Sequence, residues 1–407
     1  MEAEILSTVL WWAFGLALVL GVVANKTNFC TMGAVSDMVN MGDMARMRSW
    51  VWAMAVAIIG VSVLEYLGLV DMSLTTDNAT SNPPYRTPAL VWPRYILGGL
   101  IFGIGMTLGS GCGNKNLIRI GGGNLKSIFV VAMIGATAWA MIFTNFSYDA
   151  FLSWMTPISP DLGNSGIGAQ DAGAIIAGLA GMEDASMLRL VLGVALFAAL
   201  GFWVFKSAEF RGNWELLIGG TVVGAVVVAA WWVTAGAMGQ ELLEEAEMAD
   251  TRPFALGAQS FTFIAPAAHL GEYLRTGFSA SMVTFGLVAA AGVVAGSLLW
   301  SVVSRSFRIE WFVDLKDFIN HMIGAAMMGI GGVLAMGCTV GQAISGASTL
   351  ALGSFITFGS IVLGSTLTMK FIYYRMLYED AGVYDVLITS LADVRLVPGG
   401  MRKLEAL

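Results

Sequence analysis

The three cysteines of this chain, Cys30, Cys112 and Cys338, are the residues best suited to chemistry with a small solute. A thiol is a weak hydrogen-bond donor with a polarisable sulfur, so it can hold a solute loosely. It can also exchange with disulfides or, inside an apolar helix, act only as a small hydrophobic side chain. The residues around the cysteines indicate which of these interpretations applies.

Other kinds of cysteine site find no support in the pattern. Neither a CxxC nor an HxxxH pair occurs, and the two histidines, His269 and His321, add no ligand spacing to the cysteines, so no zinc site is predicted. The glycines before Cys112 lack the full GxGxxG spacing, and no GK[ST] follows, which argues against nucleotide binding. We therefore predict no metal, no cofactor and no catalytic centre.

Two of the cysteines lie in an internal repeat. When the chain is shifted by 226 residues, Gly98–Ile118 aligns with Gly324–Ile344, and eight of the 21 positions are identical, Cys112 and Cys338 among them. The two copies are an odd number of predicted membrane spans apart, which gives them opposite orientations. Inverted repeats of this kind build secondary transporters, whose sites lie where helices are discontinuous.

Glycine-rich segments surround both of these cysteines. Gly109–Asn114 and Gly337–Gln342 are poor helix formers, because each glycine costs about 1 kcal/mol relative to alanine. A broken helix frees backbone N–H groups, which must be buried or line a cavity, where a helix N-terminus favours an anion. Glycine that merely permits close helix packing is the alternative. We favour broken or re-entrant helices near the membrane midplane.

Cys30 follows the first apolar stretch, and the weakly matching segment of the second half places Thr262 where a fourth cysteine would stand. The other candidate lining residues are glycines or polar residues close to the cysteines, namely Asn28, Gly111, Asn114, Lys115, Gly337, Thr339 and Gln342. Each polar residue among them could instead cap a broken helix, and Lys115 could instead be an ordinary anchor on the cytoplasmic side.

The composition of the chain indicates a protein that is embedded in a lipid membrane. Of its 407 residues, 57% are apolar and 12% are charged, whereas soluble domains carry roughly 25% charged residues. The formal net charge of −7 argues against a nucleic-acid partner. About 20 apolar residues in a helix cross a bilayer. We therefore predict an all-α integral membrane protein in contact with lipid.

Nine apolar stretches are long enough to span a membrane, namely Ile5–Ala24, Trp50–Val70, Tyr95–Asn114, Ser127–Ser147, Arg189–Phe205, Leu216–Met238, Gly277–Ser304 and two within Met322–Met369. They predict a first repeat half of four spans over 1–150, an external loop and linking span over 151–210, a second, inverted half over 211–375 and a tail over 376–407. Glu65 is the one acid well inside a span, and both snorkelling to the interface and a coupling role fit it.

The distribution of positive charge orients the chain. With nine spans, sixteen of the 21 Lys and Arg residues fall on one side and five on the other. Because Lys and Arg collect on the cytoplasmic side, the N-terminus is predicted outside and the C-terminus inside a bacterial or archaeal cytoplasmic (inner) membrane. The acidic segment 239–276 is then an external, solvated loop.

These motifs resemble the YeeE/YedE family of membrane proteins. The NFC segment ending at Cys30 and two GxGxxxxxGC segments, Gly103–Cys112 and Gly329–Cys338, carry the resemblance, which extends from about residue 5 to residue 375. Membership implies nine membrane helices in an inverted-repeat, hourglass arrangement. It also implies that the three cysteines pass thiosulfate from thiol to thiol into the cytoplasm, with a small cytosolic sulfur-carrier protein of the TusA type as a partner.

The chemistry of the cysteines agrees with that implication. Thiosulfate is a dianion with a soft terminal sulfur, which several weak thiol donors in series can bind and release. Related members carry other sulfur or selenium compounds, so the substrate stays open within that class. A membrane thiol-redox protein and a channel for a small neutral solute are the alternatives from other classes.

Overall fold

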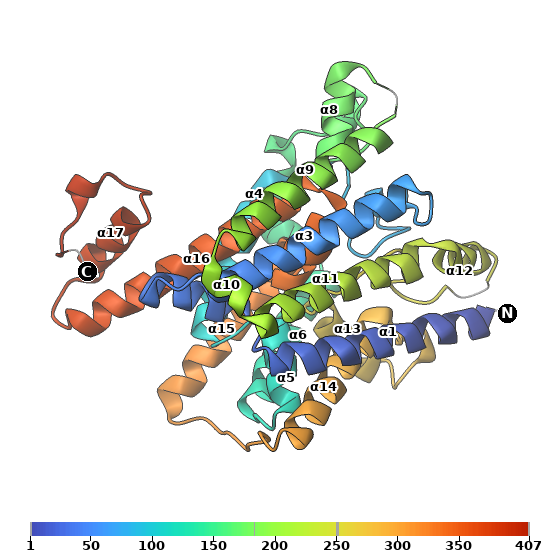
Figure 1. The fold of residues 1–407 in the computed structure, drawn as a ribbon. Coiled ribbons are helices and arrows are strands. Elements are labelled where there is room, and N and C mark those ends of the chain that lie inside the picture. The colour runs from blue at the N-terminus through green and yellow to red at the C-terminus, as the bar shows by residue number, and fades with distance from the viewer. Residues whose placement is uncertain (1, 183, 250–251, 406–407) are drawn as a thin grey trace.

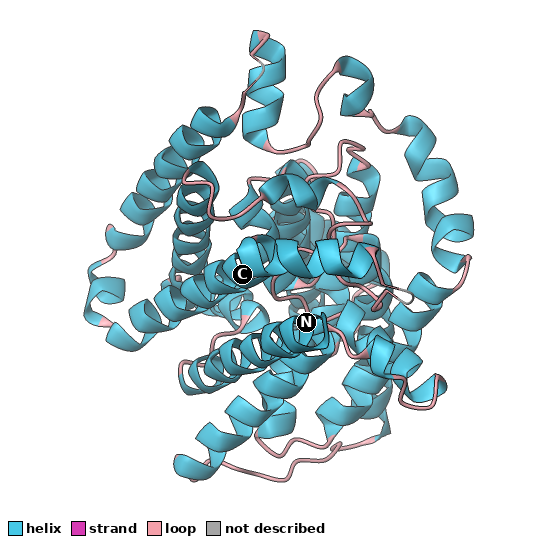
Figure 2. Ribbon diagram, turned by 90° about the vertical axis from the view of Figure 1, so that its right-hand side faces the viewer, coloured by secondary structure: helices cyan, strands magenta, loops and turns pink. Residues whose placement is uncertain are grey.

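The computed structural model describes residues 2–182, 184–249 and 252–405. Helices are the only extended regular elements in this described part, as Figure 2 shows, and β-pairing is limited to four isolated bridges. Nine helical stretches in the same residues are long and apolar enough to cross a membrane. The prediction of an all-α membrane protein with nine spans is therefore confirmed.

The nine stretches are α1 (Glu2–Lys26) with α2 (Thr31–Ser36), α3 (Ala45–Tyr66), α4 (Trp92–Leu108) with α5 (Gly113–Gly121), α6 (Lys126–Phe143), α9 (Ser186–Phe205), α11 (Trp214–Ala235) with α12 (Ala237–Glu247), α14 (Phe285–Val303), α15 (Leu315–Leu334) and α16 (Leu352–Leu377). Shorter helices lie outside the spans, namely α7 (Ser153–Met155), α8 (Ala172–Ala180), α10 (Ala208–Gly212), α13 (Ala265–Arg275) and α17 (Val383–Asp393).

The long helices run side by side in a bundle (Figure 1). The N-terminus and α12 lie at one end of the bundle, and the C-terminus and α17 lie at the other. Close helix packing depends on glycine: a Cβ added at Gly103 of α4 would lie 2.2 Å from the carbonyl oxygen of Ile361 on α16. An odd number of spans places the termini at opposite ends, so the arrangement agrees with the count.

The start of the seventh span differs from the prediction. The seventh span was expected to begin at Gly277, but α14 begins at Phe285 because the hydroxyl of Thr284 accepts the Leu287 N–H and caps the helix. The uncharged stretch Met322–Met369 divides into α15 and α16, as predicted for two spans. Hydropathy alone does not locate a cap, because residues on both sides of it are apolar.

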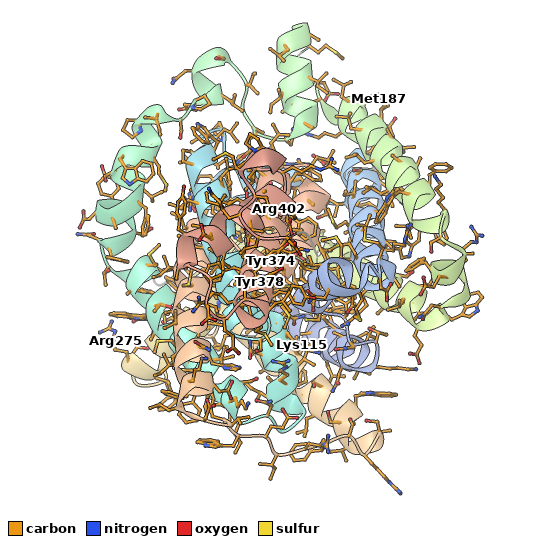
Figure 3. The ribbon with its side chains drawn as sticks, turned by 90° about the vertical axis from the view of Figure 1, so that its left-hand side faces the viewer. Lys115, Met187, Arg275, Tyr374, Tyr378 and Arg402 are labelled. Atoms are coloured by element: carbon orange, nitrogen blue, oxygen red, sulfur yellow. The ribbon has the colours of Figure 1, made fainter. Side chains whose placement is uncertain are left out.

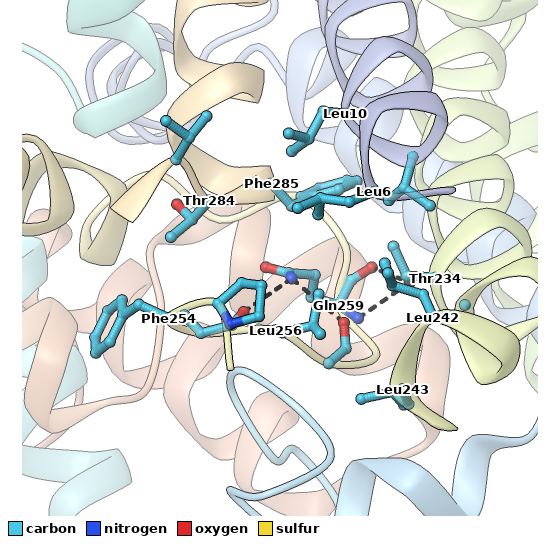
Figure 4. Close-up of a pocket in the computed structure, with 16 residues that line it drawn as sticks. Leu6, Leu10, Thr234, Leu242, Leu243, Phe254, Leu256, Gln259, Thr284 and Phe285 are labelled. Atoms are coloured by element: carbon cyan, nitrogen blue, oxygen red, sulfur yellow. Dashed lines mark hydrogen bonds between the residues drawn. The ribbon is translucent and has the colours of Figure 1, made fainter. Parts of the chain in front are cut away.

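The expectation of a solvated loop over 239–276 is wrong for most of its length. Its start belongs to α12 and its end to α13, while residues 257–264 form a non-helical segment that is buried throughout. Figure 4 shows Gln259 of this segment beside Thr234, whose hydroxyl donates to the Gln259 carbonyl at 2.6 Å. The apolar side chains of Phe261, Phe263 and Ile264 draw the segment into the core.

Candidate functional site

Two membrane helices end at the glycine-rich segments, and the chain makes the same turn at both. The Gly111 N–H donates to the Met106 carbonyl at 2.9 Å, and the Gly337 N–H donates to the Gly332 carbonyl at 2.8 Å. These residues correspond to one another under the 226-residue shift. Ser110 (φ 54°) and Met336 (φ 58°), which also correspond, both adopt the left-handed conformation. We call these turns, residues 109–114 and 337–342, the first and second break.

The helices before the two breaks pack against each other through equivalent glycines. A Cβ added at Gly98 of α4 would lie 2.9 Å from the Gly331 carbonyl oxygen, and one added at Gly105 would lie 2.6 Å from that of Gly324. The shift that aligns the repeat turns the first pair into the second. This reciprocal contact is the one expected of copies related by a two-fold axis. An inverted repeat stays a prediction, which this contact supports.

All three cysteines are buried free thiols, with 4%, 1% and 0% of Cys30, Cys112 and Cys338 exposed. Cys112 lies near both other cysteines in the protein interior. The fold therefore brings together three residues that are far apart in the sequence, and Cys112 is the one that neighbours both others.

The three thiols are held differently. The Gly33 N–H donates to the sulfur of Cys30, and the Gly341 N–H donates to the sulfur of Cys338, each at 3.4 Å. Both sulfurs therefore serve as helix N-caps. Cys112 precedes α5 without a side-chain capping bond, and the Lys115 N–H and the Thr339 hydroxyl lie beside its sulfur.

Thr262 lies beside Cys338. A Cβ added at Gly341, one turn after that cysteine, would approach the Thr262 hydroxyl oxygen to 2.7 Å. The correspondence of the pair Thr262 and Cys338 to the pair Cys30 and Cys112 stays a prediction, which this proximity supports. The buried segment 257–264 places Thr262 there.

Buried polar atoms without a partner concentrate around the breaks. Six of the twelve such side-chain atoms in the described residues lie next to the cysteines, on Thr31, Tyr85, Asn114, Thr262, Thr339 and Gln342. Buried polar groups are normally hydrogen-bonded, and exceptions often mark a ligand or solvent position. This cluster is therefore suited to hold a polar solute inside the protein.

Tyr85 is a member of this cluster that the sequence did not reveal. It lies in the segment between α3 and α4, is 1% exposed and interacts with Cys338. Its hydroxyl would lie 3.3 Å from a Cβ added at Gly341. The only sequence signal was a tyrosine after two prolines in an external loop, which does not indicate burial.

Two amide side chains near the breaks act as caps. The Asn116 amide donates to the carbonyls of Gly111 and Cys112, each at 3.1 Å, and the Gln342 amide donates to the Ala335 carbonyl at 2.5 Å. These bonds hold the backbone of the two turns, since their acceptors are carbonyls in or next to the breaks. Gln342 therefore acts as a cap through its amide nitrogen, while its side-chain oxygen has no hydrogen-bond partner.

Positive charge gathers beside the first break. The Lys115 ammonium donates to the Asn28 side-chain oxygen at 2.5 Å and interacts electrostatically with Cys30 and Cys112. Arg119 lies one turn further along α5. In the view from the end that carries α17, Lys115 is visible at the near face (Figure 3). This cation is therefore adjacent to two of the thiols.

A cavity of 380 Å³ reaches the second break from the opposite side. Thr262, Ile264 and Gly337 line it close to Cys338. Its other walls come from the segment before α4, from α4 itself and from α13. The cavity therefore ends one residue from Cys338.

An ion-pair network secures the far end of the second break. Arg86 makes a bidentate pair with Glu65 at 2.6 and 2.8 Å and donates to the Thr349 carbonyl at 2.8 Å. Arg189 joins Asp171 at 2.9 Å and Glu65 at 3.2 Å. Glu65 therefore neither snorkels to water nor stands alone, because two arginines pair with it inside the protein.

Asp171 is ionised in this network. Burial alone would raise the pKa of Asp171, but the charges of Arg86 and Arg189 and the Ala174 N–H hold that pKa below its usual range. Asp171 also caps α8, and the backbone N–H of the next residue donates to the Leu350 carbonyl at 3.1 Å. The network thus ties three segments to the residues that follow the second break.

The chain is similar to known transport proteins over most of its length. The sequence profile of a family described as sulphur transport matches residues 26–367. The chain is 24% identical over 377 residues to the thiosulfate transporter TsuA of Spirochaeta thermophila, a match that covers 90% of this chain and 99% of that protein. It is 22% identical over 377 residues to the thiosulfate transporter TsuA of Escherichia coli, with 88% of this chain and 92% of that protein covered.

Both breaks and all three cysteines lie inside the matched region. The chain therefore belongs to the sulphur transport (YeeE/YedE) family, and it is a membrane transporter rather than an enzyme.

Proposed function

We propose that this transporter imports thiosulfate, or a closely related sulfur anion, into the cytoplasm past Cys338, Cys112 and Cys30 in that order. The observation that carries the proposal is the position of Cys112, which lies near both other thiols in the protein interior. The cavity at Gly337 supports the direction, because it opens beside the first thiol of the series. The likeness to two thiosulfate transporters supports the substrate.

The donors around the thiols fit a divalent sulfur anion. The S–H groups are weak donors suited to its soft terminal sulfur, and the buried hydroxyls of Tyr85, Thr262 and Thr339 are suited to its oxygens. Several weak sites in series bind the ion enough to admit it yet allow release.

Asn28, Gly111, Asn114, Lys115, Gly337, Thr339 and Gln342 complete the proposed pathway. Lys115 supplies positive charge on the exit side of Cys112. Gly111 and Gly337 form the turns, and Gln342 and Asn28 position neighbouring groups through their hydrogen bonds. The dianion would move from an outer cavity towards this inner cation.

We also propose that the N-terminus is external and the C-terminus cytoplasmic in a bacterial or archaeal inner membrane, with inverted halves over 1–150 and 211–375. The sixteen-to-five division of the 21 Lys and Arg residues supports this orientation. A reporter fused after Leu407 should be active as a cytoplasmic fusion, and one inserted near Glu245 as an external one. The same side for both would contradict it.

Two partners follow from this placement. Apolar side chains exposed on the spans, such as Trp11, Val191 and Phe202, would contact lipid acyl chains. A small cytosolic sulfur-carrier protein of the TusA type, which the family resemblance implies, would meet the exit near Lys115. Co-purification of such a carrier with the full chain, and its loss after Lys115→Glu, is the expected result.

Uptake of radiolabelled thiosulfate by a transport-deficient host tests the proposal. Cys112→Ala and Cys338→Ala should each lower uptake at least about tenfold, because a methyl group cannot donate to the ion. Serine at either position should rescue poorly, since its donor is harder and shorter. Thr357→Ala, which removes another buried unpaired hydroxyl on α16, is the matched control and should transport normally.

Protein abundance and a monodisperse elution profile must be equal among the variants. Normal uptake by both alanine variants would remove the cysteine pathway. A thiol titration separates transport from redox chemistry: three free thiols should persist with and without thiosulfate. A thiosulfate-dependent loss of two thiols to a disulfide would instead favour the thiol-redox alternative.

A further inference from the structure

The side chain of Ile264 contacts the outer cavity and both halves of the repeat. It is 1% exposed, yet it lines this cavity of 380 Å³. A Cβ added at Gly332, whose carbonyl closes the turn of the second break, would lie 2.8 Å from the Ile264 Cγ1 carbon. One added at Gly113, the residue after Cys112, would lie 3.1 Å from the Ile264 Cδ1 carbon. One apolar side chain therefore lies where the cavity, the first break and the turn of the second break meet.

Glycine at both contact positions makes room for this side chain. A Cβ at Gly332 would be closer to Ile264 than Cβ atoms come to other carbons in proteins, so the contact exists only against glycine. At Gly113 a Cβ would also approach the Phe263 carbonyl oxygen, to 3.2 Å. The two glycines belong to different copies of the repeat. Ile264 thus fills the space that the two copies leave between them.

The backbone on either side of Ile264 is held in place. The rings of Phe261 and Phe263 stack with their centroids 6.3 Å apart, and the Ser345 hydroxyl donates to the Phe261 carbonyl at 2.8 Å. The Ala267 N–H donates to the Ile264 carbonyl at 3.1 Å and begins α13. A shorter side chain at position 264 should therefore open space beside the glycines without moving the segment.

The thiols beside Ile264 do not line the cavity. Cys112 is 1% and Cys338 is 0% exposed, and neither is among the described lining residues. A solute in the cavity therefore meets the apolar carbons of Ile264 before it reaches Cys112. Apolar constrictions in membrane pathways exclude water, and an ion that loses its water without new hydrogen bonds pays a large desolvation cost.

We propose that Ile264 is a hydrophobic barrier that separates the outer cavity from Cys112. It keeps water, protons and hydrated ions out of the pathway. A sulfur anion passes because the Cys338 thiol and the Thr262 hydroxyl next to the barrier replace its water. This inference rests on the proposed function and adds to it a residue that determines which solutes pass.

Access of an external reagent to Cys112 tests the barrier without transport. Intact cells are treated with sulfonatoethyl methanethiosulfonate, which does not cross membranes, and peptide mass spectrometry measures the label on Cys112. Ile264→Ala should raise the labelling rate at least about tenfold, because it removes the Cγ1, Cγ2 and Cδ1 carbons that form the barrier. Ile264→Val removes one carbon and disturbs the fold less, and it should raise the rate about fourfold.

Ile361→Ala is the matched control. Ile361 is 0% exposed, lies on α16 against Gly103 and is not among the described residues of the cavity wall. Its replacement loses the same carbons and should leave Cys112 labelling at the parent rate. An unchanged rate in both Ile264 variants would overturn the proposal. An equal increase in Ile264→Ala and Ile361→Ala would show that Ile264 only fills the core and would overturn it too.

Proton leak into liposomes gives a second measurement. Liposomes that contain the Ile264→Ala protein and an internal pH-sensitive dye should acidify at least about tenfold faster after an external acid pulse than those with the parent protein or Ile361→Ala. Equally tight liposomes would contradict the barrier. A parent protein without any thiosulfate uptake would refute the proposed function instead, and the labelling and leak rates would still decide whether Ile264 is a barrier.

Discussion

The first and second breaks share one backbone turn but lead into different surroundings. After Cys112 the chain continues as the short helix α5, with Lys115 and Arg119 on successive turns. After Cys338 it forms a π-helical turn over Gly341–Gly346 in which every residue is buried and none is charged. The repeat therefore preserved the turn that presents a cysteine, while the residues that follow diverged.

On the pathway proposed above, this difference supplies positive charge near both ends of the thiol series. The second break has no cation of its own, and Arg94 lies on the wall of the cavity that reaches it. The first break is followed at once by Lys115. Equivalent backbone turns thus present two thiols in differently charged surroundings.

The largest expected loss of stability tests whether the ion-pair network of Arg86 supports the second break. Arg86→Met should cost about 3–5 kcal/mol of stability, because it leaves Glu65 and Asp171 without their shared buried partner. Thermal unfolding followed by fluorescence-detected size exclusion measures the loss. The control Arg275→Met breaks an exposed pair and should cost no more than about 1 kcal/mol. Equal stability of both variants would show that the network does not support the break.

Replacing the glycine before each cysteine by alanine should affect the two breaks to different degrees. Gly111 has a φ of 154°, which a residue with a Cβ adopts only under strain of about 1–3 kcal/mol. A Cβ at Gly337, whose φ is not in the left-handed region, would meet the Gln342 side chain at 3.3 Å and the Gly341 backbone at 3.5 Å. Gly111→Ala should therefore lower the melting temperature and uptake more than Gly337→Ala does. The reverse order would contradict the assigned backbone conformations.

The two capping amides, Asn116 and Gln342, predict a smaller difference in stability between their alanine variants. Asn116→Ala removes two hydrogen bonds to the first break, and Gln342→Ala removes one from the second. At about 1 kcal/mol per bond, the first variant should be the less stable of the two. Denaturation of both purified variants beside the parent protein measures this order. A larger loss for Gln342→Ala would show that its role exceeds capping.

The smallest effect concerns external pH. Asp171 has a pKa below its usual range, so its pairing contributes stability that is present above the unfolded-state pKa of about 4 and lost as pH falls through the lower folded-state value. From pH 7 to about pH 5 the melting temperature of the parent protein should therefore not change on account of this network. Asp171→Asn should remove the acid-side decline that follows below about pH 4. An Asp171-dependent decline already above pH 5 would contradict an ionised, paired Asp171.

Local patterns in the sequence predicted the spans and the breaks. Hydropathy depends on neighbouring residues in one helix, and so nine spans could be counted before any contact was known. Glycine density marked the ends of α4 and α15 for the same reason. The buried segment 257–264 was missed because its acidic flanks suggested water, and because burial of a non-helical segment depends on what packs around it.

The sequence by itself determined that this is a nine-span, all-helical membrane protein with repeated cysteine turns, since these properties follow from hydropathy and from a detectable repeat. Only the tertiary structure decided which groups meet. It placed Cys112 near both other thiols, Tyr85 against Cys338 and Arg94 alone among neutral groups. These contacts join residues of separate segments. The distance between two such residues depends on how the helices pack, and the order of residues within one helix does not fix it.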